Sequence, residues 1–462
     1  MSLIKLHIGD SGWRAIYTDG FTLDKLSAIT LSLAELYPKQ KALIGYDNRF
    51  LSKKFAQHLT SLLSQAGWKA DLLSKIFPSP GVACLVKSKN YDWGLMITAS
   101  HNPFYYNGLK ILDAKGLLSP RSLNDQLAEK AISKIENEKL PSLYPLKEVL
   151  QLNFSKAASA YLTQISKHIE VKIFKNTQLK VAWDSFSGTT TELFPLFLKK
   201  LKLRQEGVQW INEPTFGYRR LEPDTNSLQT LKKLLLKKKC HLGIATDLDG
   251  DRFAVFDEKG RFVLPNVLGP LLIWYLLEFR KERGDLYQTV SCSQLTRDIA
   301  QYYGAEVKEM PVGFQKMGYE MATNPKSLLG LEETGGIAYA PHLCFKDGLM
   351  AHALLLEMLV SQKKKLSEMI ALMYKKFGKY YYHRVDLNLD SQEEKKQWLD
   401  LEFWEKIVGE KILNNSMIDG QKLYFSSGWL LIRDSKTEPM LRIYFESKNE
   451  KFMNKIKSRF PK

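Results

Sequence analysis

A hydroxyl-bearing hexapeptide, Thr98-Ala-Ser-His-Asn-Pro103, follows directly after the apolar run Trp93–Ile97. The strand-like run and the turn-forming Asn-Pro pair place Ser100 on a short, stiff loop at the end of a buried strand. A serine held in this way is a potential nucleophile, and His101 stands beside it. A polar turn that only ends a strand is the alternative interpretation.

A second loop, Asp247-Leu-Asp-Gly-Asp-Arg252, follows another apolar run, Leu242–Thr246. Three carboxylates at alternating positions converge on one hard divalent cation when the backbone curls around it, and Gly250 permits that curl. An oxygen-only set of ligands favours magnesium over zinc. A solvated acidic turn is the alternative, although carboxylates this close together repel one another unless a cation neutralises them.

Two other interpretations of the acidic loop fit less well. Positions one, three, five and twelve of a calcium-binding loop are occupied here by Asp247, Asp249, Asp251 and Glu258. However, such a loop needs glycine where Arg252 stands, and strand-like rather than helical segments flank this one. An aspartate-nucleophile phosphatase signature would have threonine or valine in place of Asp251.

Five ordered motifs resemble those of the α-D-phosphohexomutases, the superfamily of phosphoglucomutases and phosphomannomutases. The hallmark of that family is a Thr-Ala-Ser-His-Asn-Pro loop that carries a phosphoserine. The other four motifs are the opening loop Gly9–Arg14, the strand and helix start Gly45–Ser52, the sugar-recognition loop Gly330–Gly336 and the phosphate-binding loop Arg433–Pro439. The resemblance spans essentially the whole chain and implies a magnesium-dependent phosphohexomutase.

The resemblance implies a catalytic group built around Ser100. This serine carries the phosphoryl group, and its phosphate oxygen completes a Mg²⁺ site with the three aspartates. Lys110 and Arg14 are implied to exchange protons with the sugar hydroxyls, with a solvated lysine at a strand end as the alternative. Arg252 is implied to lie near the phosphoserine rather than on the surface. His101 either contacts the phosphoserine or fixes the loop by hydrogen bonding.

The resemblance also implies a set of substrate-binding residues. Glu332 and Thr334 stand where the family holds two ring hydroxyls, so that the sugar binds in two flipped orientations. The remaining implied contacts to sugar or phosphate are His342, Lys346, Arg433, Ser435, Lys436 and Thr437. The family usually has glycine or asparagine where Lys436 stands, so either the loop relaxes or Lys436 adds a phosphate contact.

Composition limits the class of protein. A chain of 462 residues is too long to form a single ordinary hydrophobic core, so its length predicts three or four domains. We expect no secretory signal, because Met1–Lys5 runs straight into the first motif without a sustained apolar core. We expect no membrane partner, because the most hydrophobic stretch, Val267–Phe279, is interrupted and shorter than the ~20 residues of a spanning helix. The four cysteines are far apart in the sequence, which argues against a zinc site or a disulfide framework and favours a cytoplasmic location.

The net charge of +17 raises the question of nucleic acid. The lysine pairs and triplets, however, are interleaved with leucines at helical spacing, which is typical of solvated helix faces. We therefore expect no nucleic-acid partner. A diffuse positive field would still attract doubly charged sugar phosphates.

The order of elements predicts three similar mixed-sheet α/β domains plus a smaller C-terminal α+β domain around a central cleft. A strand feeds a helix three times, with the strands expected at Ala42–Asp47, Leu179–Asp184 and Gln288–Ser293. Each copy leads to a further strand that ends in one of the motif loops. The C-terminal part is predicted to have four strands and two helices, one of them Glu393–Val408. The expected bounds are 1–145 for the phosphoserine-loop domain, 146–257 for the metal-binding domain, 258–377 for the sugar-recognition domain and 378–462 for the phosphate-binding domain.

These observations together predict a phosphohexomutase that moves a phosphoryl group between C1 and C6 of a hexose phosphate. The expected cofactors are Mg²⁺ and a hexose 1,6-bisphosphate, which is both intermediate and activator. The two glutamates and Gly336 of the sugar loop lean toward glucose. Phosphomannomutase activity is one alternative, and a catalytically weakened relative that binds sugar phosphates is another. The expected state is a monomer or homodimer.

Overall fold

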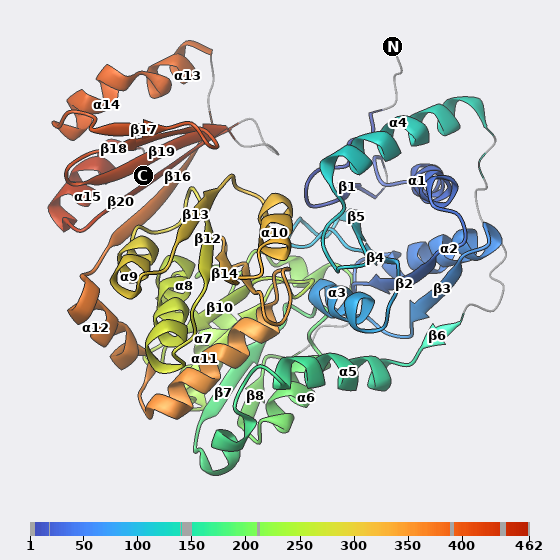
Figure 1. The fold of residues 1–462 in the computed structure, drawn as a ribbon, viewed down its shortest axis with the longest axis horizontal. Helices are drawn as coiled ribbons and strands as arrows, with labels where there is room; N and C mark the ends of the chain where they lie inside the picture. The colour runs from blue at the N-terminus through green and yellow to red at the C-terminus, as the bar shows by residue number, and fades with distance from the viewer. Residues whose placement is uncertain are drawn as a thin grey trace. The chain divides into compact units, whose positions relative to one another are not determined.

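The computed structural model describes residues 5–17, 19–138, 140, 150–209, 213–388, 392–434 and 440–460. The chain divides into two compact units. The first unit contains residues 1–264, 314–325 and 336–367, and the second contains 265–313, 326–335 and 368–462. Figure 1 colours the chain from blue at the N-terminus to red at the C-terminus.

The first unit begins with a mixed sheet. Its strands are β1 (Trp13–Ile16), β2 (Lys41–Tyr46), β3 (Lys69–Leu73), β4 (Trp93–Ile97), β5 (Tyr106–Leu112) and β6 (Gln151–Leu152), in the order β1-β5-β4-β2-β3-β6. Strands β2, β3, β4 and β6 are parallel, whereas β5 runs antiparallel to both β4 and β1. Strand β5 therefore lies next to the end of β4, where the Ser100 loop begins, and β1 pairs with the other edge of β5.

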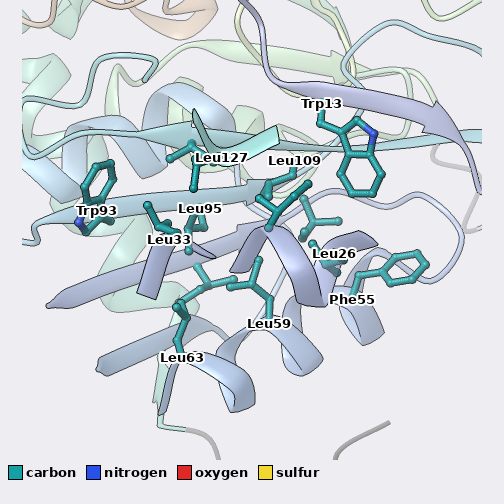
Figure 2. Packing of buried hydrophobic residues seen from close by; sticks show 14 of the residues in the cluster. Trp13, Leu26, Leu33, Phe55, Leu59, Leu63, Trp93, Leu95, Leu109 and Leu127 are labelled. Carbon is teal, nitrogen blue, oxygen red and sulfur yellow. The ribbon is translucent and has the colours of Figure 1, made fainter. Parts of the chain in front are cut away.

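Helices cover both faces of this sheet. On one face lie α1 (Leu23–Leu36), α2 (Ser52–Gln65) and α4 (Arg121–Asn137). Their leucines pack with Leu95 and Leu109 of the sheet in the buried cluster shown in Figure 2. On the other face, α3 (Ser79–Ser88) approaches closely because Gly45 and Gly94 present no side chain to it. Burial of these apolar surfaces fixes the sheet between two helical layers.

The second sheet of the first unit positions the acidic loop. Its strands are β7 (Lys180–Asp184), β8 (Arg204–Gly207), β9 (Leu242–Thr246), β10 (Phe253–Phe256) and β11 (Phe262–Val263), in the order β11-β10-β9-β7-β8. The helical segments before and between these strands are α5 (Phe154–Ser166), η1 (Val171–Asn176), α6 (Leu193–Lys200), η2 (Phe216–Tyr218) and α7 (Gln229–Lys237). The acidic loop connects the antiparallel strands β9 and β10, which fixes both of its ends.

Three later elements also belong to the first unit. They are α10 (Phe314–Thr323), β15 (Ile337–Tyr339) and α11 (Gly348–Gln362). Helix α11 is buried along most of its length and contacts β9 and β10. Its first residue, Gly348, lies against the acidic loop, because a Cβ there would be 2.5 Å from the carbonyl oxygen of Arg252 and 2.9 Å from that of Gly250. The helix therefore supports the loop from behind.

The second unit joins a parallel sheet to the C-terminal antiparallel sheet. Strands β12 (Asp285–Thr289), β13 (Val307–Met310) and β14 (Ser327–Leu331) are parallel and accompany α8 (Pro265–Trp274), its continuation η3 (Tyr275–Phe279), and α9 (Leu295–Tyr303). Helix α12 (Leu366–Phe377) leads to β16 (Tyr381–Asn388), β17 (Asn414–Ser416), β18 (Gln421–Tyr424), β19 (Gly428–Asp434) and β20 (Met440–Ser447), in the order β16-β20-β19-β18-β17.

One face of the C-terminal sheet is covered by α14 (Leu401–Val408) and α15 (Glu450–Lys457), and α13 (Gln392–Leu399) precedes them. The prediction of a single helix over Glu393–Val408 is therefore wrong. Asp400 interrupts it, because its side chain accepts the main-chain N–H of Glu402 and caps the second helix. Within the described residues, none of the helices has the length and apolarity needed to cross a membrane.

The expected fold class is confirmed: three α/β domains, the first two with mixed sheets, precede a smaller C-terminal domain. The strands expected before the two motif loops, Trp93–Ile97 and Leu242–Thr246, have these same bounds as β4 and β9. The four domain bounds and the shared central cleft stay predictions. The bound at 145 and 146 lies outside the described residues.

Candidate active site

The loop after β4 holds Ser100 in an unusual conformation. Ser100 is buried, and its φ of 52° lies in the left-handed region that few residues other than glycine adopt. Its main-chain N–H donates to Thr98 Oγ1 at 2.9 Å, which closes the turn. Strand β5 runs close behind the loop at Gly108, where a Cβ would be 2.4 Å from the carbonyl oxygen of Thr98 and 2.5 Å from that of Trp13. Only glycine allows this approach.

A buried arginine at the start of the segment after β2, Arg49, holds the same loop from behind. The residue types around Arg49 predict no role for it. Its Nη2 donates to the carbonyl oxygens of Ser100 and Asn102 at 2.5 and 2.6 Å, and its Nη1 donates to those of Pro103 and Tyr106 at 2.7 and 3.0 Å. Its Nε lies 3.2 Å from Asp47 Oδ2.

The acidic loop curls as the sequence predicts. Gly250 has a φ of 79°, and Asp247 Oδ1 accepts the main-chain N–H groups of Asp251 and Arg252. The three aspartates are buried, and one carboxylate oxygen from each lies within 4.8 Å of the others. Ser100 Oγ donates to Asp247 Oδ2 at 3.2 Å, so the two motif loops meet although 147 residues separate them.

Lys110 of β5 lies between two of these carboxylates. Its Nζ is 2.5 Å from Asp249 Oδ2 and 3.0 Å from Asp251 Oδ2, and the side chain is buried. The alternative of a solvated lysine at a strand end is therefore wrong. Lys346 adds a second ammonium, 3.7 Å from Asp251 Oδ2.

The aspartates fit a hard divalent cation. Asp249 Oδ1 and Asp251 Oδ1 are buried and have no hydrogen-bond partner among the described residues, so both are available as ligands. Burial and the neighbouring Asp251 and Asp249 charges raise the pKa of Asp247 well above its usual value. Burial also acts to raise the pKa of Asp251, but Lys110, Lys346 and Arg252 outweigh it and lower that pKa. A cation would relieve the repulsion that acts on Asp247.

His101 bridges Ser100 and Arg252. Its Nε2 lies 3.3 Å from Arg252 Nη2 and its Nδ1 lies 3.3 Å from Ser100 Oγ. Burial and the Arg252 charge lower the pKa of His101 well below its usual value, so the ring is neutral. Because a guanidinium only donates, Nε2 must accept, which leaves the proton on Nδ1, facing Ser100. His101 thus both contacts Ser100 and helps to hold the Ser100 loop in place by hydrogen bonding.

Arg14 of β1 also contacts the Ser100 loop. Its Nη1 donates to Asn102 Oδ1 at 2.8 Å, and the Asp249 and Asp251 charges act on its guanidinium. The pairing of β1 with β5 sets Arg14 opposite Gly108. Arg252, the last residue of the acidic loop, is buried rather than a surface residue. Its Nε lies 4.0 Å from Asp247 Oδ2, and its Nη1 lies 3.4 Å from Glu222 Oε1.

The predicted substrate-binding residues lie elsewhere in the chain. His342 is buried, and its Nε2 lies 3.0 Å from Asp347 Oδ2. The other carboxylate oxygen of Asp347, Oδ1, accepts a hydrogen bond from the Tyr161 hydroxyl. In the second unit, Glu332 and Thr334 lie on the turn after β14. Arg433 of β19 is buried, and its Nη2 lies 2.9 Å from Asp419 Oδ2. Ser435, Lys436 and Thr437 lie outside the described residues.

Four family profiles match the chain in order. They describe phosphoglucomutase/phosphomannomutase alpha/beta/alpha domains I, II and III, at residues 5–139, 159–260 and 265–377, and the phosphoglucomutase/phosphomannomutase C-terminal domain, at residues 389–461. The chain belongs to the α-D-phosphohexomutase superfamily. It is accordingly an enzyme of the phosphomutase type, an isomerase.

Relatives of this phosphohexomutase match over almost their full length. A phosphoglucosamine/phosphogalactosamine mutase from Sulfurisphaera tokodaii is 28% identical over 458 residues, covering 97% of this chain and 96% of the other. A phosphoglucomutase/phosphomannomutase from Thermococcus kodakarensis is 27% identical over 448 residues, covering 96% and 94%. The structure of parafusin, a phosphoglucomutase from Paramecium, has the same fold, with a TM-score of 0.82, 19% identity and coverage of 98% and 93%.

Proposed function

We propose that this phosphohexomutase transfers a phosphoryl group between C1 and C6 of a hexose phosphate, with Ser100 as the carrier and a bisphosphorylated sugar as the intermediate. The observation that carries the proposal is the meeting of Ser100 Oγ with Asp247, in a buried group that holds three aspartates, Lys110 and Arg252. A serine that only ended a strand would have no reason to face this group.

The aspartates and the Ser100 oxygen would hold Mg²⁺, which when bound neutralises negative charge on the phosphoryl group. Transfer forms a bond between a sugar oxygen and phosphorus and breaks the bond between phosphorus and Ser100 Oγ. The proton of the attacking hydroxyl must leave, and we assign its removal and return to Lys110 and Arg14. His101, neutral and with its proton on Nδ1, orients the Ser100 oxygen.

The substrate is proposed to be held at both ends. Glu332 and Thr334 would bind two ring hydroxyls, and Arg433 would bind the distal phosphate, together with Ser435, Lys436 and Thr437. The Nε of Arg433 has no hydrogen-bond partner among the described residues, and a guanidinium donor suits a phosphate oxygen. His342 and Lys346 are proposed to add charge near the sugar.

Glucose phosphates are the substrates that the sugar loop favours, because it combines two glutamates with Gly336. Glucosamine phosphates are the second candidate, since several relatives of similar identity are named phosphoglucosamine mutases. Mannose phosphates are the third candidate, because the Thermococcus relative is named a phosphoglucomutase/phosphomannomutase.

The test is an assay with Mg²⁺ and a trace of glucose 1,6-bisphosphate against glucose, glucosamine and mannose 1-phosphates. We expect turnover of glucose 1-phosphate, loss of activity in Ser100→Ala, and wild-type activity in Ser61→Ala, a buried serine on α2. Turnover of none of the three sugars would favour the catalytically weakened relative. Full activity in Ser100→Ala would exclude the phosphoserine mechanism.

A further inference from the structure

Four main-chain carbonyls of the Ser100 loop converge on one point. The carbonyl oxygens of Ser100, Asn102, Pro103 and Tyr106 all accept from the terminal nitrogens of Arg49. Carbonyl dipoles that point at a common centre repel one another unless a cation lies there. The buried guanidinium therefore stabilises a loop conformation that the backbone alone would not keep.

The donors of Arg49 match this task in number and direction. A guanidinium carries four terminal N–H groups in a fixed plane, and each terminal nitrogen here serves two carbonyls. The fifth donor nitrogen, Nε, lies 3.2 Å from Asp47 Oδ2 and forms an ion pair with that carboxylate. A lysine would place its three donors around a single atom and could not span carbonyls from four residues.

The arginine is itself firmly anchored. Asp47 accepts the Ser52 hydroxyl at 2.7 Å and the Arg49 main-chain N–H at 3.0 Å. Ser52 Oγ in turn accepts from Asn107 of β5 at 3.0 Å. The network ties the end of β2, the start of α2 and β5 to the loop, so the position of Ser100 depends on the rigid part of the sheet.

We propose that Arg49 is a positioning residue for phosphoryl transfer, which holds the left-handed backbone of Ser100 so that Oγ faces the acidic loop throughout the cycle. The inference rests on the proposed role of Ser100 as the carrier. Because Ser100 gains and loses a doubly charged group in each turnover, its backbone must keep one position in both states. Arg49 acts through main-chain carbonyls of the loop, so we do not assign it a contact with the reacting atoms.

Two substitutions test the proposal. Arg49→Lys keeps a positive charge beside Asp47 but cannot reach the four carbonyls, and Arg49→Met removes the charge. The matched control is Arg219→Lys, which alters another guanidinium–carboxylate pair of the same unit, Arg219 with Asp184. We expect both Arg49 variants to lower kcat by roughly 100-fold with KM within about twofold, because small misplacements of a reacting group cost that much. The control should keep kcat.

Hydrogen exchange of the main-chain amides at 98–106 supplies a readout that does not need turnover. We expect faster exchange in Arg49→Lys than in the wild type and the control, at temperatures where circular dichroism shows all three folded. If Arg49→Met does not fold, Arg49→Lys alone decides.

Normal kcat in folded Arg49→Lys, or unchanged exchange at 98–106, would overturn the proposal. A loss of activity that matches only the unfolded fraction would also overturn it, since that is the effect of a purely structural residue. An inactive wild type would contradict the proposed function, while the exchange comparison would still decide whether Arg49 holds the loop.

Discussion

Ser100 combines a costly backbone conformation with a chemically useful direction. A left-handed φ costs a non-glycine residue about 1–3 kcal/mol, and such strain persists only where the surroundings hold it. Here the surroundings are the Thr98 hydroxyl, the Arg49 guanidinium and the His101 ring. Each acts on a different part of the residue: the N–H, the C=O and Oγ. Three neighbouring side chains thus fix the position of the serine.

Lys110 provides a prediction at the scale of one side chain. Lys110→Met removes a buried cation from between Asp249 and Asp251, and leaving buried charges unpaired costs roughly 3–5 kcal/mol. We expect a lower Tm in EDTA and a larger rise in Tm on adding Mg²⁺ than the wild type shows, because the metal replaces the lost charge. Mutase activity should fall at least about 100-fold.

The control is Lys134→Met on α4, which breaks ion pairs with Glu35 and Glu138 far along the sequence from the aspartates. Its Tm should respond to Mg²⁺ as the wild type does. An equal Mg²⁺ response in Lys110→Met and Lys134→Met would show that Lys110 and the metal do not share the carboxylates.

At the scale of elements, the site depends on how closely β5 approaches its neighbours. Gly108→Ala would place a methyl group 2.4 Å from the Thr98 carbonyl and 2.5 Å from the Trp13 carbonyl, and neither backbone can move without shifting the Ser100 loop or β1. We expect a loss of roughly 1–3 kcal/mol of stability, the usual effect of overpacking, together with a fall in kcat.

Gly9→Ala is the matched substitution, because its nearest atoms would lie 3.7 Å away, at ordinary van der Waals distance. Thermal unfolding and steady-state kinetics of the two variants check the difference. Equal stability and equal kcat would mean that β5 can move away from the loop without consequence.

The contact between β20 and the start of α9 gives a pH-dependent prediction. Glu446 Oε2 accepts the Gln294 N–H at 2.7 Å and Trp429 Nε1–H at 2.9 Å, and burial raises the pKa of Glu446 from 4.5 to about 7. Since the folded form holds its proton to higher pH than the unfolded form, this group makes stability fall as the pH rises from 4.5 through about 7. The loss amounts to about 3 kcal/mol.

Glu446→Gln keeps an oxygen acceptor but cannot ionise. Its Tm relative to the wild type should therefore rise as the pH is taken from about 5 to about 8, where the wild type must bury a charge. The control is Glu450→Gln, at the exposed start of α15, whose difference in Tm from the wild type should not change over this range of pH. A constant difference for Glu446→Gln as well would refute the shifted pKa.

The elements that a continuous apolar pattern marks were predictable from the sequence. Strands β4 and β9 are apolar throughout and were located to the residue. The strand of the third copy was not located correctly. It was expected at Gln288–Ser293, whereas β12 spans Asp285–Thr289, because the chain turns where the Cys292 N–H donates to the Thr289 carbonyl. Such a turn depends on main-chain geometry, which residue types alone do not determine.

At the scale of the whole molecule, the site is assembled from segments that lie far apart in the chain. The motif loops were predictable because their residue types can take part in catalysis or bind a metal. The buried group around Ser100 contains the catalytic and metal-binding residues that the sequence predicts for it. Arg49 was not assigned a role, because its partners are carbonyls more than fifty residues away. A carbonyl occurs in every residue, so no side-chain pattern could have revealed this contact.

Overall charge leads to a last prediction, on how the substrate arrives. The chain carries a net charge of +17, and its lysine runs lie on α6, on α7 and in the exposed turns that follow α7 and α11. Their field is long-ranged only at low ionic strength, because the Debye length falls from about 30 Å at 0.01 M salt to about 3 Å at 1 M. A dianionic sugar phosphate is attracted by this field, whereas the chemical step inside the buried site is not exposed to it.

We therefore expect kcat/KM to fall by about tenfold or more over this range of salt while kcat stays constant. The measurement is steady-state kinetics in sodium chloride and in sodium acetate, because a screening effect depends on ionic strength alone. If kcat/KM falls with ionic strength at different rates in the two salts, an anion instead competes with the substrate at the phosphate site. A kcat/KM that does not change with salt would mean that the positive charge is too dispersed to guide the substrate, and that its role is confined to solubility.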